Sequence, residues 1–501
     1  MTLVAPSSPG AAALPATVQE THSAILFGVG DRVYKMKKPV DLGFLDFTTR
    51  EAREAVCHRE LVLNRRLSPD VYLGVDDVVD ETGLAYEHLL VMRRMPQDRA
   101  LRTMVLSGQP VEPGLRQLAR LLAAFHATSD TSEAVEAAGS LPSVRRNWHD
   151  GLDVLADFAG PVVDPGTYER MRLLADRYLA GRAPLFDQRR ALGRLRDGHG
   201  DLLAADIYLL DDGPRVLDCI EFDDDLRFGD VLLDVAFLAM DLEDLGRPDL
   251  AAVFLRDYEE FSGQVQPVSL AAHYIAYRAL VRSKVACLRW AQGDSDSREQ
   301  ARRLAELSLR HLEIAQTRLV VVGGLPGTGK STLATDLADA HGWTLLSSDL
   351  LRRQGLGRDE RARYDAASTN RVYVDLLARA RTALALGESV VLDASWSDSH
   401  WRAAAAQIAE DTASALVEVL CVAPAALCEE RMQRRAAQGR DPSEADPAVA
   451  DSMASRFAAW PSAHRLETDR DRAAVLADAE ARLSTAPGRA GTLAPVPSRL
   501  G

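Results

Sequence analysis

The stretch that decides the fold of the C-terminal half is RLVVVGGLPGTGKSTLATDLADAH, residues 318–341. Its apolar start predicts a buried strand, and a helical pattern follows the glycines. Between the two, the spacing G-x-x-x-x-G-K-[ST] is met at Gly324, Gly329, Lys330 and Ser331. Glycines in such a loop let backbone N–H groups face phosphate oxygens, and the start of the helix adds positive potential. The stretch therefore predicts a phosphate-binding loop between a strand and a helix.

This loop is expected to hold the triphosphate of ATP. Lys330 can reach the β- and γ-phosphate oxygens, and the Ser331 hydroxyl can ligate Mg²⁺. The alternative is a glycine turn without a nucleotide, and the strand before the loop and the helix after it argue against that alternative. The predicted nucleotide-binding residues of the loop are Gly324, Leu325, Pro326, Gly327, Thr328, Gly329, Lys330, Ser331 and Thr332.

Strands and helices alternate along the sequence after residue 318. Strand patterns occur at 318–323, 344–347, 389–393 and 415–422, and helical patterns separate them. This βαβ alternation predicts an α/β domain with a parallel sheet, which we place at residues 318–485, followed by a flexible tail at 486–501.

Polar residues with a chemical role are expected at the carboxyl ends of these strands. In SSDLLRR, Asp349 can take the proton of an acceptor hydroxyl. Arg352, one helical turn later, can hold an anionic substrate or a phosphate. Asp393 ends the strand ESVVLDA and is predicted to act on Mg²⁺, through a water molecule.

Four arginines follow in CEERMQRRAAQGRDPSEAD, namely Arg431, Arg434, Arg435 and Arg440. They could form a lid over the phosphates, and we predict Arg431 and Arg435 as nucleotide-binding residues. A solvated basic face of a helix accounts for the same pattern. We call the loop residues with Asp349, Arg352, Asp393, Arg431 and Arg435 the P-loop site.

A different set of residues predicts a nucleotide site in the N-terminal half. SAILFGVGDRVYKMKKPV, residues 23–40, reads as a β-hairpin in which Lys35 and Lys37 project from one face. Either lysine could meet the α- and β-phosphates, and taken alone the pattern is better explained by a solvated edge strand. Glu60, on a predicted helix at 49–67, is the candidate ion-pair partner.

The loop HGDLLAAD, residues 199–206, supplies carboxylates in a spacing used for phosphoryl transfer. Asp201 is the candidate base for a substrate hydroxyl, and Asp206, five residues later, is a candidate Mg²⁺ ligand. Asp218, in RVLDCIEF, is the second candidate ligand. Crowded carboxylates are costly without a cation, so a Mg²⁺ site explains the cluster, and an acidic surface turn is the alternative. We call these residues, with Lys35, Lys37 and Glu60, the N-terminal site.

HGDLLAAD, VLD and FGDVLLDVAFLAMDL together resemble the aminoglycoside phosphotransferase and choline kinase group. The resemblance implies an α+β protein-kinase-like domain over residues 21–312. The chain departs from the group at Asp206, where the group has Asn, and it lacks a long glycine-rich loop. A carboxylate there should still bind a metal ion, whereas its extra charge could slow phosphoryl transfer.

The C-terminal half resembles the small P-loop kinases, the group of polynucleotide 5′-hydroxyl kinase, zeta toxin and gluconate kinase. The likeness rests on the phosphate-binding loop, on SSDLLR and on the arginines near 431–440. It implies phosphoryl transfer to a hydroxyl group.

Length and composition set further limits. With 501 residues, the chain is too long for one hydrophobic core. Its net charge of −14 disfavours nucleic acid as a partner without excluding it. The five scattered cysteines and the lack of a signal peptide or membrane span predict a cytoplasmic protein. Residues 1–20 are expected to form a flexible leader.

Together these patterns predict an ATP- and Mg²⁺-dependent phosphotransferase that acts on a hydroxyl-bearing small molecule, or on a nucleic-acid end. The rival hypothesis is a nucleotide-gated regulatory protein whose N-terminal kinase-like domain is degenerate. The acceptor and the oligomeric state are left open by the sequence.

Overall fold

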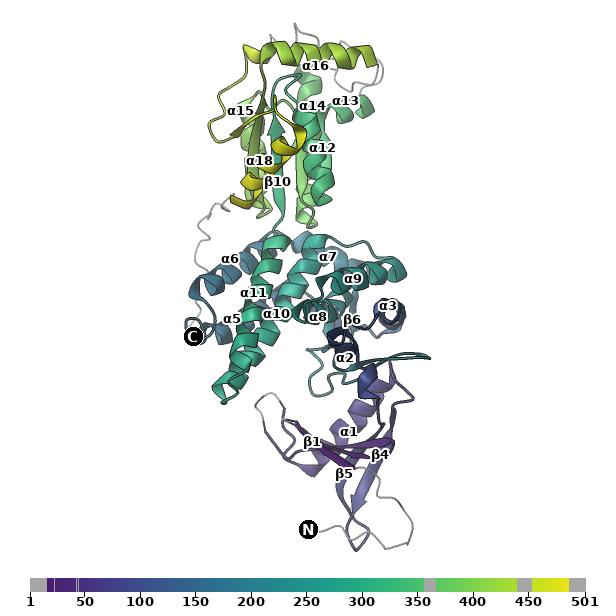
Figure 1. Cartoon of the computed structure of the whole chain (residues 1–501). Coiled ribbons are helices and arrows are strands. Elements are labelled where there is room, and N and C mark those ends of the chain that lie inside the picture. The colour runs from purple at the N-terminus through teal and green to yellow at the C-terminus, as the bar shows by residue number, and fades with distance from the viewer. Residues whose placement is uncertain are drawn as a thin grey trace. The chain divides into compact units, whose positions relative to one another are not determined.

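The computed structural model describes residues 16–21, 23–41, 43, 45–355, 366–438 and 453–485 (Figure 1). Four predicted features lie outside the described residues: Arg440, the side chain of Arg435, the tail at 486–501 and the first 15 residues of the leader. Contacts divide the chain into two compact units. Unit 1 comprises Met1–Val144 and Arg189–Val265, and unit 2 comprises Arg145–Gln188 and Gln266–Gly501. The domain limits 21–312 and 318–485 remain a prediction.

Unit 1 contains a five-stranded antiparallel sheet in the order β1-β2-β3-β5-β4. The β2–β3 hairpin turns at Gly30, whose φ of 60° is readily adopted only by glycine. Residues 16–20, predicted as part of a flexible leader, instead form the edge strand β1. Its described side chains are exposed, so it has no buried apolar face that the sequence pattern could have revealed. The strand bounds are β1 Ala16–Glu20, β2 Ala24–Val29, β3 Arg32–Lys37, β4 Tyr72–Val79 and β5 Ala85–Arg93.

Helix α1 (Arg50–Arg65) follows the hairpin and contacts β4 and β5. Thr49 is its N-cap, and its side-chain oxygen accepts a hydrogen bond from the backbone N–H of Ala52 at 3.2 Å. The helix buries Glu60 completely. The predicted ion-pair partner of the hairpin lysines is therefore inside the protein.

The rest of unit 1 is mainly helical, with two short antiparallel ribbons, β6–β9 and β7–β8. The predicted catalytic loop connects β6 with β7. Helix α8 is buried on nearly all sides, which explains its run of apolar residues and leaves Asp234 and Asp241 inside the protein. The bounds are η1 Gln97–Arg99, α2 Leu101–Leu106, α3 Glu112–Thr128, α4 Glu133–Ala138, β6 Leu195–Asp197, β7 Ile207–Leu210, β8 Gly213–Val216, β9 Phe228–Asp230, α8 Val231–Asp244 and α9 Pro248–Ser262.

Unit 2 combines a group of helices with a parallel sheet. Two of its helices, α5 and α7, extend across the boundary between the units. The bounds are α5 Leu141–Ala156, α6 Pro165–Ala180, α7 Ala183–Ala191, α10 Val268–Ala291 and α11 Ser297–Ala315.

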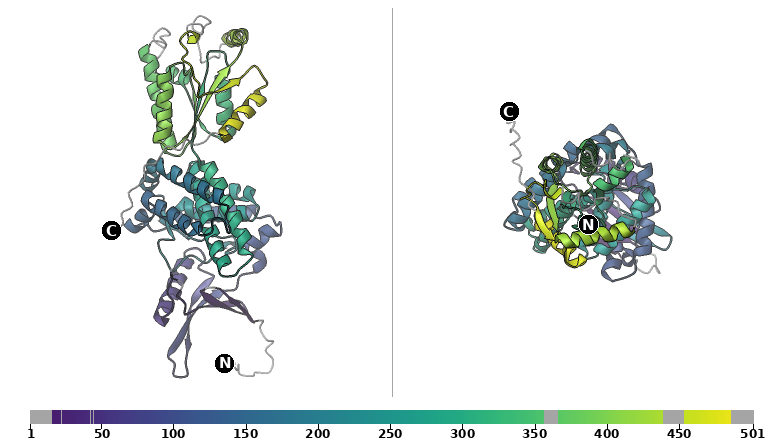
Figure 2. Two further views of the ribbon diagram at one scale, coloured as in Figure 1. Left: turned by 90° about the vertical axis from the view of Figure 1, so that its left-hand side faces the viewer. Right: turned by 90° about the horizontal axis from the view of Figure 1, so that it is seen from above.

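The parallel sheet has five strands in the order β11-β12-β10-β13-β14, with β10 at its centre. Side chains of β10 alternate between its two faces: Leu319 and Val321 pack in one core, Val320 and Val322 in the other. Figure 2 shows helices on both faces of the sheet. The bounds are β10 Arg318–Gly323, α12 Lys330–His341, β11 Thr344–Ser347, α13 Ser348–Gly355, α14 Ala366–Ala385, β12 Val390–Asp393, α15 Ser399–Asp411, β13 Ala415–Val422, α16 Ala425–Gln438, β14 His464–Glu467 and α18 Arg472–Thr485.

Both predicted fold classes are confirmed. The N-terminal part is α+β with an antiparallel sheet, and the C-terminal part is an α/β domain with a parallel sheet. All five cysteines are free thiols and buried. Within the described ranges, none of the helices has the length and apolar character that a membrane crossing needs.

Candidate active sites

The phosphate-binding loop lies between the central strand β10 and helix α12. Gly324, Gly327 and Gly329 have φ values of 146°, 82° and 83°, which side chains rarely tolerate. A Cβ atom on Gly327 would lie 2.6 Å from the carbonyl oxygen of Cys428. The sequence therefore needs glycine here for both conformation and space. In the described structure, no side chain caps the start of α12, so its first N–H groups stay available to an anion.

Asp393 ends β12 beside the loop, in register with Val322 of β10. The Ser347 hydroxyl donates a hydrogen bond to its Oδ2 at 3.1 Å. Its other oxygen, Oδ1, is buried and has no hydrogen-bond partner among the described residues. Burial raises the pKa of Asp393, while Lys330 and the Ser331 hydroxyl act to lower it. A Mg²⁺ ion with its water would satisfy this buried oxygen, so the residues present fit the predicted metal ion.

Asp349 and Arg352 lie in the first turns of α13, directly after β11. Arg352 Nη1 donates to Asp349 Oδ1 at 2.9 Å, and both side chains are mostly buried. The predicted base and the predicted anion-binding residue are thus brought together at the carboxyl end of a strand adjacent to β12. Asp349 can accept a proton at its carboxylate, while Arg352 holds that carboxylate in place.

Arg431 is held against the loop by the backbone. From α16, its Nη2 donates to the carbonyl oxygen of Thr468 at 2.7 Å, and its Nη1 to that of Gly327 at 3.3 Å. This arginine therefore positions the loop, whether or not it also binds phosphate. Arg434 is exposed. The arginine lid remains a prediction.

One contact of the loop, that of Thr468, could not be predicted from the sequence. It follows the edge strand β14, and its hydroxyl donates to the carbonyl oxygen of Thr328 at 2.6 Å. An isolated threonine far along the chain carries no motif that could reveal such a role.

In the N-terminal site, Lys35 and Lys37 share one buried carboxylate. Lys35 Nζ lies 2.8 Å from Glu60 Oε1, and Lys37 Nζ lies 2.7 Å from Glu60 Oε2. Lys37 is only 1% exposed and also pairs with Glu221 at 2.5 Å. Lys35 retains some exposure and pairs with Asp218 at 2.9 Å. Of the two lysines, Lys35 is thus the one that an incoming phosphate could reach.

Asp218 combines exposure with an unusual backbone. Its φ of 65° is uncommon for a residue other than glycine, and such conformations cluster at functional sites. Its side chain is 51% exposed, so its carboxylate is accessible to a ligand. The Lys35 ammonium lowers the pKa of Asp218 to about 2. Asp218 is therefore ionised at neutral pH.

Asp206 has the opposite electrostatic environment. Burial and the neighbouring carboxylates of Asp218 and Asp201 raise its pKa well above the usual range. A divalent cation between Asp206 and Asp218 would remove this repulsion, which is the observation that fits a Mg²⁺ ion here. Across the described residues, no group of three or more His, Cys, Asp and Glu is placed to hold a metal ion. The remaining ligands would come from water and nucleotide phosphates, as is usual for Mg²⁺.

Two aspartates of α8 hold the loop that carries Asp201. Asp234 accepts hydrogen bonds from the backbone N–H groups of His199 and Gly200, each at 2.8 Å. Asp241 accepts one from the N–H of Ala204, also at 2.8 Å. Sequence reasoning noted the stretch FGDVLLDVAFLAMDL only as part of a resemblance and missed this positioning role.

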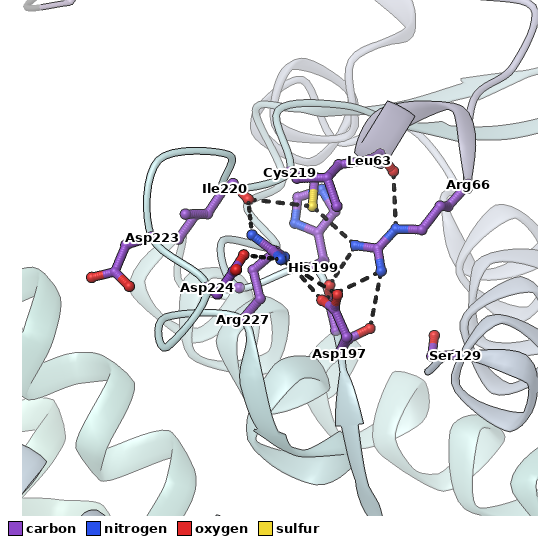
Figure 3. A network of polar contacts seen from close by, with 12 residues as sticks. Leu63, Arg66, Ser129, Asp197, His199, Cys219, Ile220, Asp223, Asp224 and Arg227 are labelled. Carbon is purple, nitrogen blue, oxygen red and sulfur yellow. Dashed lines mark hydrogen bonds and ion pairs between the residues drawn. The ribbon is translucent and has the colours of Figure 1, made fainter. Parts of the chain in front are cut away.

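A network of arginines connects the loop with α1 (Figure 3). Arg66, at the end of α1, donates to the carbonyl oxygens of Asp197 and Gly198 at 3.2 and 2.8 Å. Arg227 donates to the Asp197 carboxylate at 2.9 Å and to the carbonyl oxygen of Ile220 at 2.8 Å. The segments before Asp201 and after Asp218 are therefore tied to one another.

The fold and these two groups of residues define a class: a protein-kinase-like half joined to a P-loop domain. Residues 319–460 match the family described as AAA domain. An uncharacterized protein of Mycobacterium tuberculosis, Rv2004c, is 42% identical over 460 residues, which is 90% of this chain and 92% of that protein. The chain belongs to the family of this mycobacterial protein.

Solved structures similar to the chain fall into two groups. A choline/ethanolamine kinase family protein from Mesorhizobium loti is 15% identical, covers 60% of this chain and 92% of its own, and has a TM-score of 0.38. A putative kinase from Chloroflexus aurantiacus is 24% identical, covers 33% of this chain and 98% of its own, and has a TM-score of 0.29.

Proposed function

We propose that this protein transfers the γ-phosphate of ATP to a hydroxyl group of a small molecule, and that the P-loop site is the main catalyst. One observation carries the proposal. Three features lie at the carboxyl ends of adjacent strands of one sheet: the uncapped start of α12, the buried Asp393 and the Asp349–Arg352 pair. This edge offers an anion cradle, a place for a cation and a base.

In the proposed reaction, the loop N–H groups and Lys330 bind the phosphates of ATP and orient the γ-phosphorus. The acceptor hydroxyl oxygen forms a new bond to that phosphorus, and the bond from phosphorus to the ADP oxygen breaks. The hydroxyl proton passes to the carboxylate of Asp349, which Arg352 keeps in place 2.9 Å away. When bound, Mg²⁺ would neutralise charge on the phosphates, with Ser331 and Asp393 as its candidate holders.

At the N-terminal site we propose the same type of reaction, with Asp201 as the base and Lys35 as the phosphate-binding lysine. The exposure of Lys35 and the burial of Lys37 support this choice between the two. Asp206 and Asp218 are the candidate Mg²⁺ ligands.

A second candidate function is regulatory: the N-terminal half binds a nucleotide without transferring phosphate. The raised pKa of Asp206, caused by burial and by Asp218 and Asp201, favours it. A neutral Asp206 would bind a cation weakly. In addition, Lys35 is already engaged by two carboxylates, so the phosphates of ATP would have to compete for it.

The test is transfer of labelled phosphate from ATP to pooled sugars, aminoglycosides and 5′-hydroxyl oligonucleotides. Wild type, Lys330→Ala and Asp201→Ala are compared. We expect Lys330→Ala to abolish most of the transfer. If Asp201→Ala has no effect, the N-terminal half is regulatory. Full activity in both variants would refute both site assignments, and labelled oligonucleotide ends would favour nucleic acid over a small molecule as the acceptor.

A further inference from the structure

Unit 1 contains a pocket that neither nucleotide site uses. It has a volume of about 280 Å³ and lies between α3, the segment before β6, the start of α8 and the end of α9. Three arginines line it, Arg120, Arg194 and Arg196, and among the described residues that line it there is no Asp or Glu. In a chain with a net charge of −14, such a concentration of positive charge needs an explanation.

Two buried polar atoms in this pocket are without partners. In the described structure, neither Arg194 Nε nor Gln264 Oε1 makes a hydrogen bond, although solvent reaches neither atom. Buried polar groups are normally satisfied, so two exceptions in one pocket indicate a missing partner. A ligand that accepts a hydrogen bond from Arg194 and donates one to Gln264 would supply it.

The carboxylates near Arg194 already accept hydrogen bonds from other groups. Asp230 acts to raise the pKa of Arg194, but its two oxygens accept hydrogen bonds from Arg189 at 2.6 and 2.7 Å. Burial and the charge of Arg189 lower the pKa of Arg194. Asp234 is equally committed to the loop before Asp201. The positive charge of the pocket is thus left for a ligand.

The pocket walls are held in place without a ligand. His126 of α3 bonds to the Tyr258 hydroxyl at 2.8 Å and to Asp234 Oδ2 at 3.0 Å. On the other side, Arg194 is fixed through its backbone, whose N–H donates to Arg189 and whose carbonyl accepts from Val231. A preformed cavity with a few convergent polar groups is the usual form of a small-molecule site.

We propose that this pocket binds a small phosphate monoester, with its phosphate on Arg120, Arg194 and Arg196. Guanidinium groups match phosphate oxygens in bidentate geometry. A phosphate monoester carries nearly two negative charges at neutral pH and can match several arginines, whereas a monocarboxylate carries one. Its remaining atoms would contact Phe261, and a hydroxyl of its body would donate to Gln264.

The experiment measures binding of labelled inorganic phosphate to the full chain while a non-hydrolysable ATP analogue with Mg²⁺ occupies the nucleotide sites. We expect saturable binding of one phosphate per chain. Arg194→Gln and Arg196→Gln should each weaken it at least about tenfold, because each removes a charge-assisted contact. Arg102→Gln, an exposed arginine of α2 outside the pocket, is the matched control and should bind as wild type.

Three outcomes would overturn the proposal. The first is that no phosphate binds beyond the nucleotide sites. The second is that the Arg194→Gln and Arg196→Gln variants bind phosphate as tightly as wild type does. The third is that acetate competes for the site as well as glycerol 3-phosphate does. Thermal unfolding of each variant is measured in parallel. Arg194→Lys keeps the charge but loses the forked geometry, so intermediate binding by a folded Arg194→Lys protein would support the assigned contacts.

Discussion

Replacing Asp234 by Asn tests how the loop of the N-terminal site is held. The carboxylate is almost fully buried and accepts the N–H groups of His199 and Gly200, while His126 contacts it at 3.0 Å. Asparagine has nearly the same shape but only one acceptor oxygen. Its NH₂ group would face one of the two N–H donors, and the other contact would lose its charge assistance.

The free-energy cost of this substitution can be estimated from these hydrogen bonds. A hydrogen bond to a charged group contributes roughly 1.5–3 kcal/mol, so losing one and weakening another should cost roughly 2–4 kcal/mol. If the loop opens locally, its amide hydrogens should exchange roughly 30 to 1,000 times faster. The pKa of Asp234 is lowered by its histidine and backbone partners against the opposing effect of burial. The difference in loop stability between wild type and variant should therefore be largest at neutral pH. It should vanish as acid protonates the wild-type carboxylate.

Hydrogen exchange followed by mass spectrometry gives the readout for the peptide that contains residues 198–206. Asp249→Asn is the control, because Asp249 is exposed on α9 and pairs only at the surface with Arg247. Unchanged exchange at His199 and Gly200 in the Asp234 variant would refute the proposed anchoring.

Three further substitutions test the remaining assignments. Lys37→Met leaves the buried Glu221 without its ion-pair partner and Glu60 with Lys35 alone, and should destabilise unit 1 by roughly 3–5 kcal/mol in urea unfolding; an unchanged midpoint would contradict this structural role. Gly327→Ala puts a Cβ atom 2.6 Å from a carbonyl oxygen and should weaken ATP binding at the P-loop site, measured by titration calorimetry. Gly342→Ala, at a similar φ but with open space around it, is the control and should bind ATP normally. Asp349→Asn should retain ATP binding and lose phosphate transfer, since the base is removed and the cradle is not; equal loss of both would disprove its role.

Local patterns predicted where the phosphate-binding loop lies. The glycine spacing at 324–331 is a local signal, the strand before it has the predicted bounds, and a helix follows it as predicted. The predicted strand ending at Asp393 likewise became β12, because a short buried strand in a parallel sheet is apolar throughout. Sequence spacing alone sufficed where one strand and one turn set the geometry.

Long-range contacts were beyond the sequence. The sequence could not decide which of Lys35 and Lys37 meets the phosphates, since both occupy one face of β3 and their distant partners, Asp218 and Glu221, distinguish them. Thr468 and Asp234 act through the backbone of remote loops, which leaves no spacing to recognise. The arginines of the unit 1 pocket are also dispersed along the chain.

The central claim is that the chain holds two separate cradles for a nucleoside triphosphate. The most direct measurement is a crystal structure of the full protein with a non-hydrolysable ATP analogue and Mg²⁺. We predict triphosphate density on the first turn of α12 at Lys330 and, separately, beside Lys35 and Asp218. Density in neither place would contradict the account.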